Sequence, residues 1–466
     1  MAPVSPDARE AALARLRADG AAPATVAGFE RALELLAAGD RGLVAEAEIE
    51  PAEPDADYEA LAPAGGDERD LLDRTVVIKL NGGLGTSMGM SGPKSLLEVK
   101  DGLSFLEITA RQLQALRGRT GDPRLPLVLL DSFRTSAPSL EALGRVGEMS
   151  AGLPADFLQG RVPKLVDDGS LTPVSWPADP ELEWSPPGHG DLYPALAGSG
   201  LLDRLLADGY RYAFVSNADN LGAVVDPAIL GWLAAGEVPF AMEVARRTEA
   251  DRKGGHIARR HDGGLVLREV AQTPEADLEA FADIERHRYF NTNSIWLDLR
   301  AIAAEMGGGG VIELPLIVNR KTVDPSDPGS TAVIQLETAA GAALGAIPGA
   351  RALLVPRGRF MPVKTTDDLL VVRSDAYRLE PDFTLSFAGN PALGPPVVEL
   401  DRAHFGLIGR FEERFPGGAP SLVGCRRLAV TGDVLFGAGV EVVGAVALHA
   451  PAGERMVVEP ATRLAG

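Results

Sequence analysis

The sequence predicts an α/β protein with a mostly parallel sheet that is covered by helices on both faces. Short apolar runs alternate with helical patterns from residue 70 onward, which is typical of that class. A helical segment precedes this region and a stretch punctuated by glycine follows it. Because 466 residues exceed one ordinary core, we expect three parts: an N-terminal extension over residues 1–69, a central domain over 70–380 and a C-terminal domain over 381–466.

The N-terminal extension is predicted to be helical. Residues 7–19 and 25–38 carry apolar side chains at helical spacing, and Gly20 and Gly39 follow as stop signals. Residues 50–67 are rich in proline, glycine and acidic side chains and are expected to form a loop. Nothing in this part of the sequence indicates chemistry.

The central domain supplies the strands and helices of the predicted sheet. Strands are expected at residues 75–80, 125–130, 212–216, 239–244 and 294–297. Helices are expected at residues 105–117 and 139–146. In such sheets ligands bind beyond the carboxyl ends of the strands, so the loops that follow the strands are the places to look for function.

The C-terminal domain has a six-residue rhythm. Apolar pairs recur at Leu428/Val430, Val434/Phe436, Val440/Val442 and Val446/Leu448. Glycines at 432, 437, 439 and 444 stand between them, as expected at the corners of a short β-helix. An antiparallel meander is the alternative, and four consecutive matches favour the β-helix.

Composition excludes several classes of protein. The formal net charge of −20 argues against a nucleic-acid groove or an anionic membrane surface as the main partner. The single cysteine, Cys425, excludes an intrachain disulfide and a multi-cysteine metal site. No apolar stretch reaches the ~18 residues of a membrane helix, and residues 1–10 lack the pattern of a signal peptide. We therefore expect a cytoplasmic enzyme.

The strongest local signal is a glycine-rich loop at residues 79–95, directly after the first predicted strand. Its glycines let backbone N–H groups converge on phosphate oxygens, and Lys94 adds a full positive charge. The loop fits neither the dinucleotide fingerprint nor the ATPase P-loop, because Met88 stands where the third glycine is required and Pro93 separates Gly92 from Lys94. A glycine turn without a ligand would not explain the whole run, so phosphate binding is favoured.

This loop resembles the signature of the eukaryotic-type UTP–glucose-1-phosphate uridylyltransferases, also called UDP-glucose pyrophosphorylases. The likeness continues in the same order to the β-helix, through blocks at residues 157–159, 184–191, 214–221, 242–244, 253–255, 290–293, 333–338 and 359–366. The resemblance implies a Rossmann-like nucleotidyltransferase domain of the GT-A type, a left-handed β-helix, and Mg²⁺-dependent transfer of UMP from UTP to glucose 1-phosphate.

The resemblance also implies roles for single residues. The UTP phosphates are expected over Leu80, Asn81, Gly82 and Gly83, and the uracil at Gln159 and Gly188. The sugar phosphate is assigned to His189, Asn217, Asn291 and Asn293. Lys94 and Lys364 are expected to be the catalytic lysines, although Lys364 by sequence alone reads as an ordinary exposed lysine. His189 has a structural turn role as its alternative, and Gln159 a place on the surface.

Asp219 is the expected Mg²⁺ ligand. It follows the strand at residues 212–216, beside the phosphate loop, and Mg²⁺ needs only one or two protein carboxylates when phosphates and water complete its shell. The alternative is a turn in which Asn217, Asp219 and their neighbours cap their own backbone, and both roles can coexist. Glu243, Lys253, Gly255, Lys321 and Glu337 fall in or near shared blocks without separable roles.

The sequence departs from the family pattern at a few positions. Met90 and Ser91 stand where many relatives have Cys-Lys, Ser294 where Asn is common, and Asp131 where Asn is frequent. The chain stops soon after Leu464 and is shorter than animal relatives that use their extreme C-terminus to assemble, so the resemblance implies a monomer or a small homo-oligomer. Two rival functions stay open: the same transfer to another sugar 1-phosphate, such as galactose or N-acetylglucosamine 1-phosphate, and a silent nucleotide-sugar sensor or scaffold.

Overall fold

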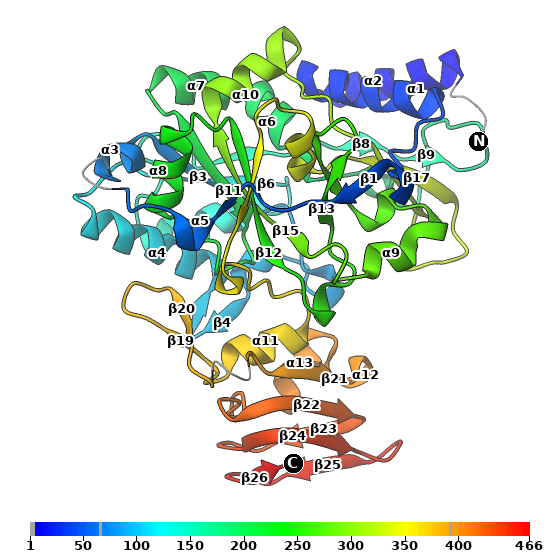
Figure 1. Cartoon of the computed structure of the whole chain (residues 1–466). Coiled ribbons are helices and arrows are strands. Elements are labelled where there is room, and N and C mark those ends of the chain that lie inside the picture. The colour runs from blue at the N-terminus through cyan, green and yellow to red at the C-terminus, as the bar shows by residue number, and fades with distance from the viewer. Residues whose placement is uncertain (1–4, 65–67, 391–393) are drawn as a thin grey trace.

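A large mixed sheet forms the centre of the computed structural model, which describes residues 5–64, 68–390 and 394–466 (Figure 1). Its strands lie in the order β2-β18-β12-β15-β11-β3-β6-β7. Their bounds are β2 (Ala56–Asp57), β18 (Arg351–Leu354), β12 (Phe240–Arg246), β15 (Tyr289–Asp298), β11 (Tyr212–Asn217), β3 (Thr75–Leu80), β6 (Leu127–Asp131) and β7 (Asp156–Leu158). Only β15 runs antiparallel to both of its neighbours along this path, but three further strands, described below, extend the same sheet with antiparallel pairs. The sheet as a whole is therefore mixed, and the part from β11 through β3 and β6 to β7 is parallel, as expected.

Helices cover both faces of this sheet, as expected. The helices α6 (Leu192–Gly198), α7 (Leu201–Ala207) and α10 (Leu299–Met306) bury their apolar side chains against one face. On the other face lie α3 (Glu68–Asp73), α4 (Phe105–Arg119), α5 (Ser136–Val146) and α8 (Pro227–Ala235). The strands between them are buried runs such as Val76, Val77 and Ile78, because a sheet covered on both sides exposes neither face to water.

The segment at residues 50–67 is more ordered than the predicted loop. Strand β1 (Ile49–Pro51) pairs with β13 (His256–Arg260), which also pairs with β14 (Leu265–Arg268), and β2 adds a parallel edge strand to β18. Backbone pairing with partners distant in sequence overrides the local turn signals here. Residues 65–67 of the expected loop lie outside the described part of the chain.

The N-terminal helices lie along the outside of the α/β body (Figure 1). Helices α1 (Pro6–Ala18) and α2 (Pro23–Ala37) share an apolar core with small strands of the body, including Leu165 and Leu336. These strands are β8 (Val162–Pro163), β9 (Leu165–Val166), β10 (Trp184–Ser185), β16 (Ile317–Thr322) and β17 (Ala332–Glu337). The two helices predicted in this part of the chain are thus confirmed, and they dock by burial of their apolar side chains.

A connecting layer joins the body to the C-terminal stack. It holds β4 (Glu98–Lys100), β5 (Leu103–Ser104), α11 (Thr366–Arg373), β19 (Tyr377–Leu379), β20 (Leu385–Phe387), α12 (Arg402–Phe405) and α13 (Ile408–Arg414). Helix α9 (Leu278–Ala282) packs against β13, because the ring centre of Phe281 lies 5.0 Å from that of His256 (Figure 1).

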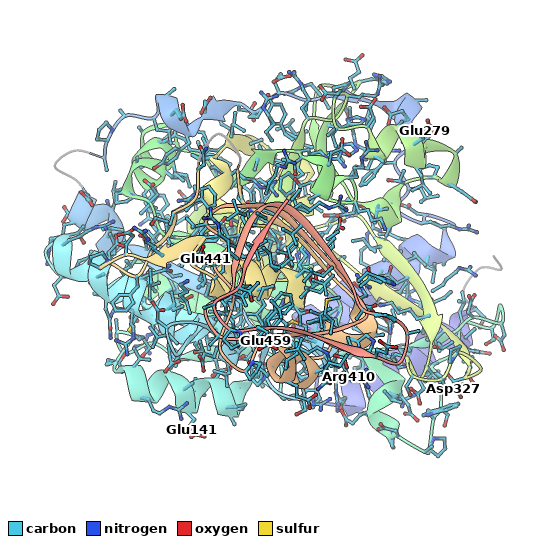
Figure 2. The ribbon with its side chains drawn as sticks, turned by 90° about the horizontal axis from the view of Figure 1, so that it is seen from below. Glu141, Glu279, Asp327, Arg410, Glu441 and Glu459 are labelled. Atoms are coloured by element: carbon cyan, nitrogen blue, oxygen red, sulfur yellow. The ribbon has the colours of Figure 1, made fainter. Side chains whose placement is uncertain are left out.

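The C-terminal strands stack in parallel coils, so the antiparallel meander is excluded. Strands β21 (Val397–Leu400), β22 (Cys425–Thr431), β24 (Glu441–His449) and β26 (Arg463–Ala465) form one face, and β23 (Asp433–Phe436) and β25 (Arg455–Val458) form another. Leu428 lies beside Val446 on the neighbouring strand, and in the sequence Val446 stands three six-residue units after Leu428. Three such units therefore make one coil. The view along this stack in Figure 2 shows exposed acidic side chains such as Glu141 and Asp327 at the rim of the molecule.

No helix in the described ranges is long and apolar enough to cross a membrane.

Candidate active site

A cleft of about 330 Å³ opens where β3 and β11 end, at the carboxyl edge of the sheet. Parallel pairing sets the last residues of these strands, Leu80 and Asn217, directly beside each other. Ten of the thirteen predicted site residues line this cleft: Leu80, Asn81, Gly82, Gly83, Lys94, Gln159, Gly188, His189, Asn217 and Asp219. The structure therefore brings together segments that lie far apart in the sequence.

The glycine loop is closed on itself and packed tightly against Gln159. The backbone N–H of Lys94 donates to the carbonyl of Gly83 at 3.0 Å, which ties the two ends of the loop together. A Cβ atom at Gly82 would lie 2.5 Å from Gln159 Oε1, so only glycine leaves this carboxamide in place. Because of this close approach, the glycine loop and Gln159, the expected uracil contact, line the same side of the cleft.

Lys94 and Asp219 form an ion pair across the cleft. Lys94 Nζ lies 2.5 Å from Asp219 Oδ2, and the two side chains are only 17% and 19% exposed. The lysine comes from the loop after β3 and the aspartate from the turn after β11. A cation and an anion are thus held together where both charges are partly shielded from water.

His189 lines the cleft as a neutral ring. Its Nδ1 accepts a hydrogen bond from the backbone N–H of Ala340 at 3.0 Å, so Nε2 carries the proton. Enclosure by protein lowers the pKa of His189 to about 4. The neighbouring Gly188 has φ 82°, and a Cβ there would lie 2.4 Å from the carbonyl oxygen of Thr338. Both features hold the imidazole in one orientation as a hydrogen-bond donor.

Asn291 and Asn293 extend the cleft from β15. Asn293 Nδ2 donates to Asn217 Oδ1 at 2.7 Å, and the Asn291 carboxamide oxygen accepts from the backbone N–H of Asn293 at 2.8 Å. The pairing of β15 with β12 shifts register at this point, and Asn293 adopts φ 58°, a left-handed conformation that asparagine tolerates. The bulge turns Asn293 toward Asn217, although neither β15 asparagine is among the residues that line the cleft.

Lys364 lies outside the lining of the cleft. Its side chain is exposed, with Nζ 5.8 Å from the centre of the Phe360 ring. The chain just before it is fixed to the site, because the backbone N–H of Val363 donates to the carbonyl of Asp219 at 3.4 Å. Lys364 is therefore adjacent to the metal-ligand candidate through the backbone, and the positive charge of its ammonium group acts on a second carboxylate, Glu269, where it partly offsets the rise in pKa caused by burial.

Glu269 is a residue near the site that sequence reasoning missed. Burial raises its pKa, which the charge of Lys364 and a hydrogen bond from Asn291 partly offset. A Cβ atom at Gly255 would lie 2.4 Å from this carboxylate, so the glycine of the shared Lys-Gly-Gly block makes room for it. That block was the available signal. Ser95 was missed as well; it lines the cleft, and its Oγ has no hydrogen-bond partner among the described residues.

The donor set suits Mg²⁺ with substrate oxygens rather than a site made wholly by protein. No group of three or more His, Cys, Asp or Glu side chains with metal-binding geometry occurs in the described part of the chain. Asp219 supplies one carboxylate at the lip of a phosphate loop, and Mg²⁺ usually takes one or two carboxylates together with phosphates and water. The residues present fit that mode of binding.

Among the other residues of the shared blocks, Glu243 has a structural role. It is fully buried and receives two hydrogen bonds from Arg359, at 2.5 and 2.8 Å, and one from Trp296 at 2.8 Å. Lys253 and Lys321 are exposed and lie outside the lining of the cleft. The buried ion pair of Glu243 with Arg359 fixes β12 to the segment that carries Lys364.

A glycine loop at the carboxyl edge of a mixed α/β sheet, facing a shielded lysine–aspartate pair, defines an enzyme site for phosphorylated ligands. Residues 27–442 match the family model described as UTP–glucose-1-phosphate uridylyltransferase. The chain belongs to this family.

Individual relatives agree with the family assignment. UTP–glucose-1-phosphate uridylyltransferase of Pyrus pyrifolia is 40% identical over 405 residues, which cover 86% of this chain and 83% of the relative. The Saccharomyces cerevisiae enzyme is 40% identical over 388 residues, covering 83% and 76%. A variant of UDP-glucose pyrophosphorylase from Leishmania major, solved in complex with UDP-glucose, is 40% identical with a TM-score of 0.92 and coverage of 99% and 98%. A Trypanosoma brucei structure reaches 42% identity and a TM-score of 0.90, with coverage of 98% of each chain.

Proposed function

We propose that this protein joins UTP to glucose 1-phosphate and releases UDP-glucose and pyrophosphate. The observation that carries the proposal is the cleft in which the glycine loop, Gln159 and the Lys94–Asp219 pair meet, in a chain of this family. An oxygen of the sugar phosphate attacks the α-phosphorus of UTP, and the bond to pyrophosphate breaks as the new bond forms. The nucleophile is already an anion, so the site needs no strong general base.

The proposed roles follow from the need to bring two polyanions together and to offset the charge that develops. The loop at residues 80–83 would hold the UTP phosphates, with Lys94 exchanging Asp219 for phosphate oxygens. Gln159 and Gly188 would contact the uracil. His189, Asn217, Asn291 and Asn293 would contact the sugar phosphate, with His189 donating from Nε2. Lys364 would act near the α-phosphate after its side chain turns from Phe360 toward the cleft.

Mg²⁺ would be held by Asp219 and phosphate oxygens, and when bound it would neutralise charge on the UTP phosphates. Asp219 also keeps Lys94 at the mouth of the loop through their ion pair.

Several finer assignments belong to the same proposal. We propose that the central domain over residues 70–380 is a Rossmann-like nucleotidyltransferase domain of the GT-A type, and that the coils of the C-terminal domain over 381–466 are left-handed. The parallel coils and their six-residue period support the second assignment. A cytoplasmic location and a monomeric or small oligomeric state are proposed with them.

The decisive experiment measures pyrophosphate release by the purified protein with Mg²⁺, UTP and a panel of sugar 1-phosphates, with other nucleoside triphosphates as controls. Release confined to UTP with glucose 1-phosphate supports the proposal. Release with several sugars keeps the chemistry and widens the substrate class. Binding of UTP without release from any pair would replace the proposal with a nucleotide-sugar sensor.

A further inference from the structure

Asp131 lies behind the nucleotide cleft, at the carboxyl end of β6, and is fully buried. Its Oδ1 accepts a hydrogen bond from Asn81 Nδ2 at 2.7 Å, and its backbone carbonyl accepts one from the backbone N–H of Gln159 at 2.7 Å. Asn81 belongs to the proposed phosphate loop and Gln159 to the proposed uracil site. One residue thus supports both segments that would contact the nucleotide.

The contact with Asn81 is part of a fixed arrangement. The same Asn81 Nδ2 donates to Ser139 Oγ at 2.8 Å, and the backbone N–H of Asn81 donates to the carbonyl of Leu130 at 2.8 Å. The side-chain amide therefore has its two hydrogens directed away from the cleft. Any change in charge on Asp131 acts directly behind the loop, with protein rather than water between them.

Within the described residues no cation faces Asp131, and the polar contacts from Asn81 and Thr135 only partly offset the effect of burial, which raises its pKa. Asn81 from the end of β3, Thr135 at the start of α5 and Ser139 within α5 are neutral. The ionisable group that faces it is Asp156 on β7, which is itself a carboxylate. Within the described residues, Asp131 Oδ2 has no hydrogen-bond partner. An ionised Asp131 would leave this oxygen as an unpaired buried charge, which is costly.

We propose that Asp131 is a positioning residue that supports the nucleotide loop as a neutral carboxylic acid, and that nucleotide binding drives uptake of a proton by this group. The inference rests on the proposed nucleotide site. In the free protein, burial raises the pKa of Asp131 to about 7. Negatively charged phosphates bound over residues 80–83 raise it further, because they disfavour a second negative charge behind the loop.

The sign of the pH dependence follows from linkage. Below the pKa that Asp131 has in the free protein, this side chain is already protonated, so nucleotide binding takes up no proton. Above it, the free protein is ionised and binding must restore the proton, so the nucleotide binds more weakly as the pH rises. The steepest slope for one proton is about tenfold in Kd per pH unit.

The test titrates UDP-glucose into the wild-type protein and into Asp131→Asn by calorimetry from about pH 6 to about pH 9, in buffers of different ionisation enthalpy. The diphosphate bridge of UDP-glucose carries no proton that titrates in this range. Lys79 and Asp191 have pKa values of about 7, and they are unchanged in the variant. The difference between the two proteins therefore reports Asp131, because asparagine keeps the acceptor for Asn81 and removes the acid.

The expected result is a Kd at about pH 8 that is several-fold to roughly tenfold lower for Asp131→Asn than for wild type, with up to one fewer proton taken up per ligand. At about pH 6 the two proteins should bind alike. Asp156→Asn keeps Asp131 but removes the negative charge that faces it, which lowers the pKa of Asp131. In this variant the Kd for UDP-glucose should begin to rise at a lower pH than in the wild type, with the same slope. A merely structural role for Asp131 would not produce this shift.

Equal pH profiles and equal proton uptake for wild type and Asp131→Asn would overturn the inference. No binding of UDP-glucose by the wild type at any pH would instead overturn the proposed function.

Thermal melting checks the fold of the variant. A folded-state pKa above the usual value makes the contribution of Asp131 to stability fall as the pH rises through about 7. Asp131→Asn should therefore melt above wild type at about pH 8, by a margin that narrows toward about pH 4.

Discussion

At the scale of single residues, the Lys94–Asp219 pair is the part of the cleft where charge is concentrated. Replacing Lys94 by Met removes the cation and leaves Asp219 as an unpaired negative charge beside the phosphates. We expect kcat/KM for UTP to fall by about 10²–10³, the usual loss when one preorganised electrostatic contact is removed. Pyrophosphate release measures it. Lys321→Met is the control, because Lys321 is an exposed lysine on β16, and it should keep the wild-type rate. A loss below about threefold for Lys94→Met would contradict its role.

Lys364 should affect a different kinetic constant. Its ammonium group lies over the Phe360 ring, outside the lining of the cleft, so UTP reaches the loop without it. We expect Lys364→Ala to lower kcat by about 10², while the Kd for UTP changes less than about twofold. Steady-state rates and equilibrium binding, measured on the same protein, separate these two effects. Unchanged turnover would eliminate a role in the transition state.

At the scale of elements, the glycine loop after β3 depends on its contact with Gln159. A methyl group at Gly82 would overlap the Gln159 carboxamide, whereas a Cβ at Gly83 meets no atom within 4 Å. Gly82→Ala should therefore raise the Kd for UTP by about tenfold, or about 1.4 kcal/mol, and Gly83→Ala should raise it less. Equilibrium binding with melting temperatures would test this pair. Equal effects of the two substitutions would show that the contact with Gln159 is unimportant.

The elements most open to prediction from the sequence are those defined by local pattern. Strand β3 was predicted with its observed bounds, because a buried apolar run is visible residue by residue. Strand β15 was predicted only at residues 294–297, although it spans Tyr289–Asp298, because Asn291 and Asn293 interrupt the apolar run. The bulge that makes those asparagines useful depends on pairing with β12, which no local pattern contains.

For the site as well, the residues that could be predicted from the sequence are those that belong to a local pattern. Asp219 and the glycine loop follow strands, and the general rule for α/β sheets directs attention to them. Lys364 and Glu269 are held near the site by contacts between distant segments, namely Val363 with Asp219 and Glu269 with Gly255. Spacing in the sequence gives no hint of such contacts. Only the resemblance suggested Lys364, and Glu269 was identified only from the structure, by its packing against Gly255.

At the scale of the whole molecule, one apolar core joins the phosphate loop to the C-terminal coils. Met88 of the loop and Leu97 share a cluster with Leu428 and Phe436 of the β-helix. The side chain of Leu407, between α12 and α13, lies against Gly89 of the loop, where a Cβ atom would be 3.0 Å from it. The C-terminal part of the chain thus supports the outer side of the glycine loop.

Leu407 offers a test of this support, because it is 43% exposed and contributes little to the core. We expect Leu407→Ala to weaken UTP binding by about fivefold, or about 1 kcal/mol, with a small change in melting temperature. Leu428→Ala, in the centre of the same cluster, should instead cost about 2–5 kcal/mol of unfolding free energy. Denaturant unfolding and UTP titration distinguish the two outcomes. Unchanged binding by Leu407→Ala would show that the loop stands without the C-terminal contact.

The ion pair of Lys94 with Asp219 also bears on how the protein responds to ionic strength. Asp219 is the counterion of Lys94 within the cleft, so a nucleotide that binds there exchanges one anion for another around the lysine instead of neutralising a bare cation. The chain as a whole has a net charge of −20, and its long-range field repels a polyanion. Added salt screens that repulsion over distances beyond about 10 Å while it affects the shielded pair much less. Moderate salt should thus speed the arrival of the nucleotide, the reverse of the behaviour of enzymes that attract anionic substrates with a basic surface.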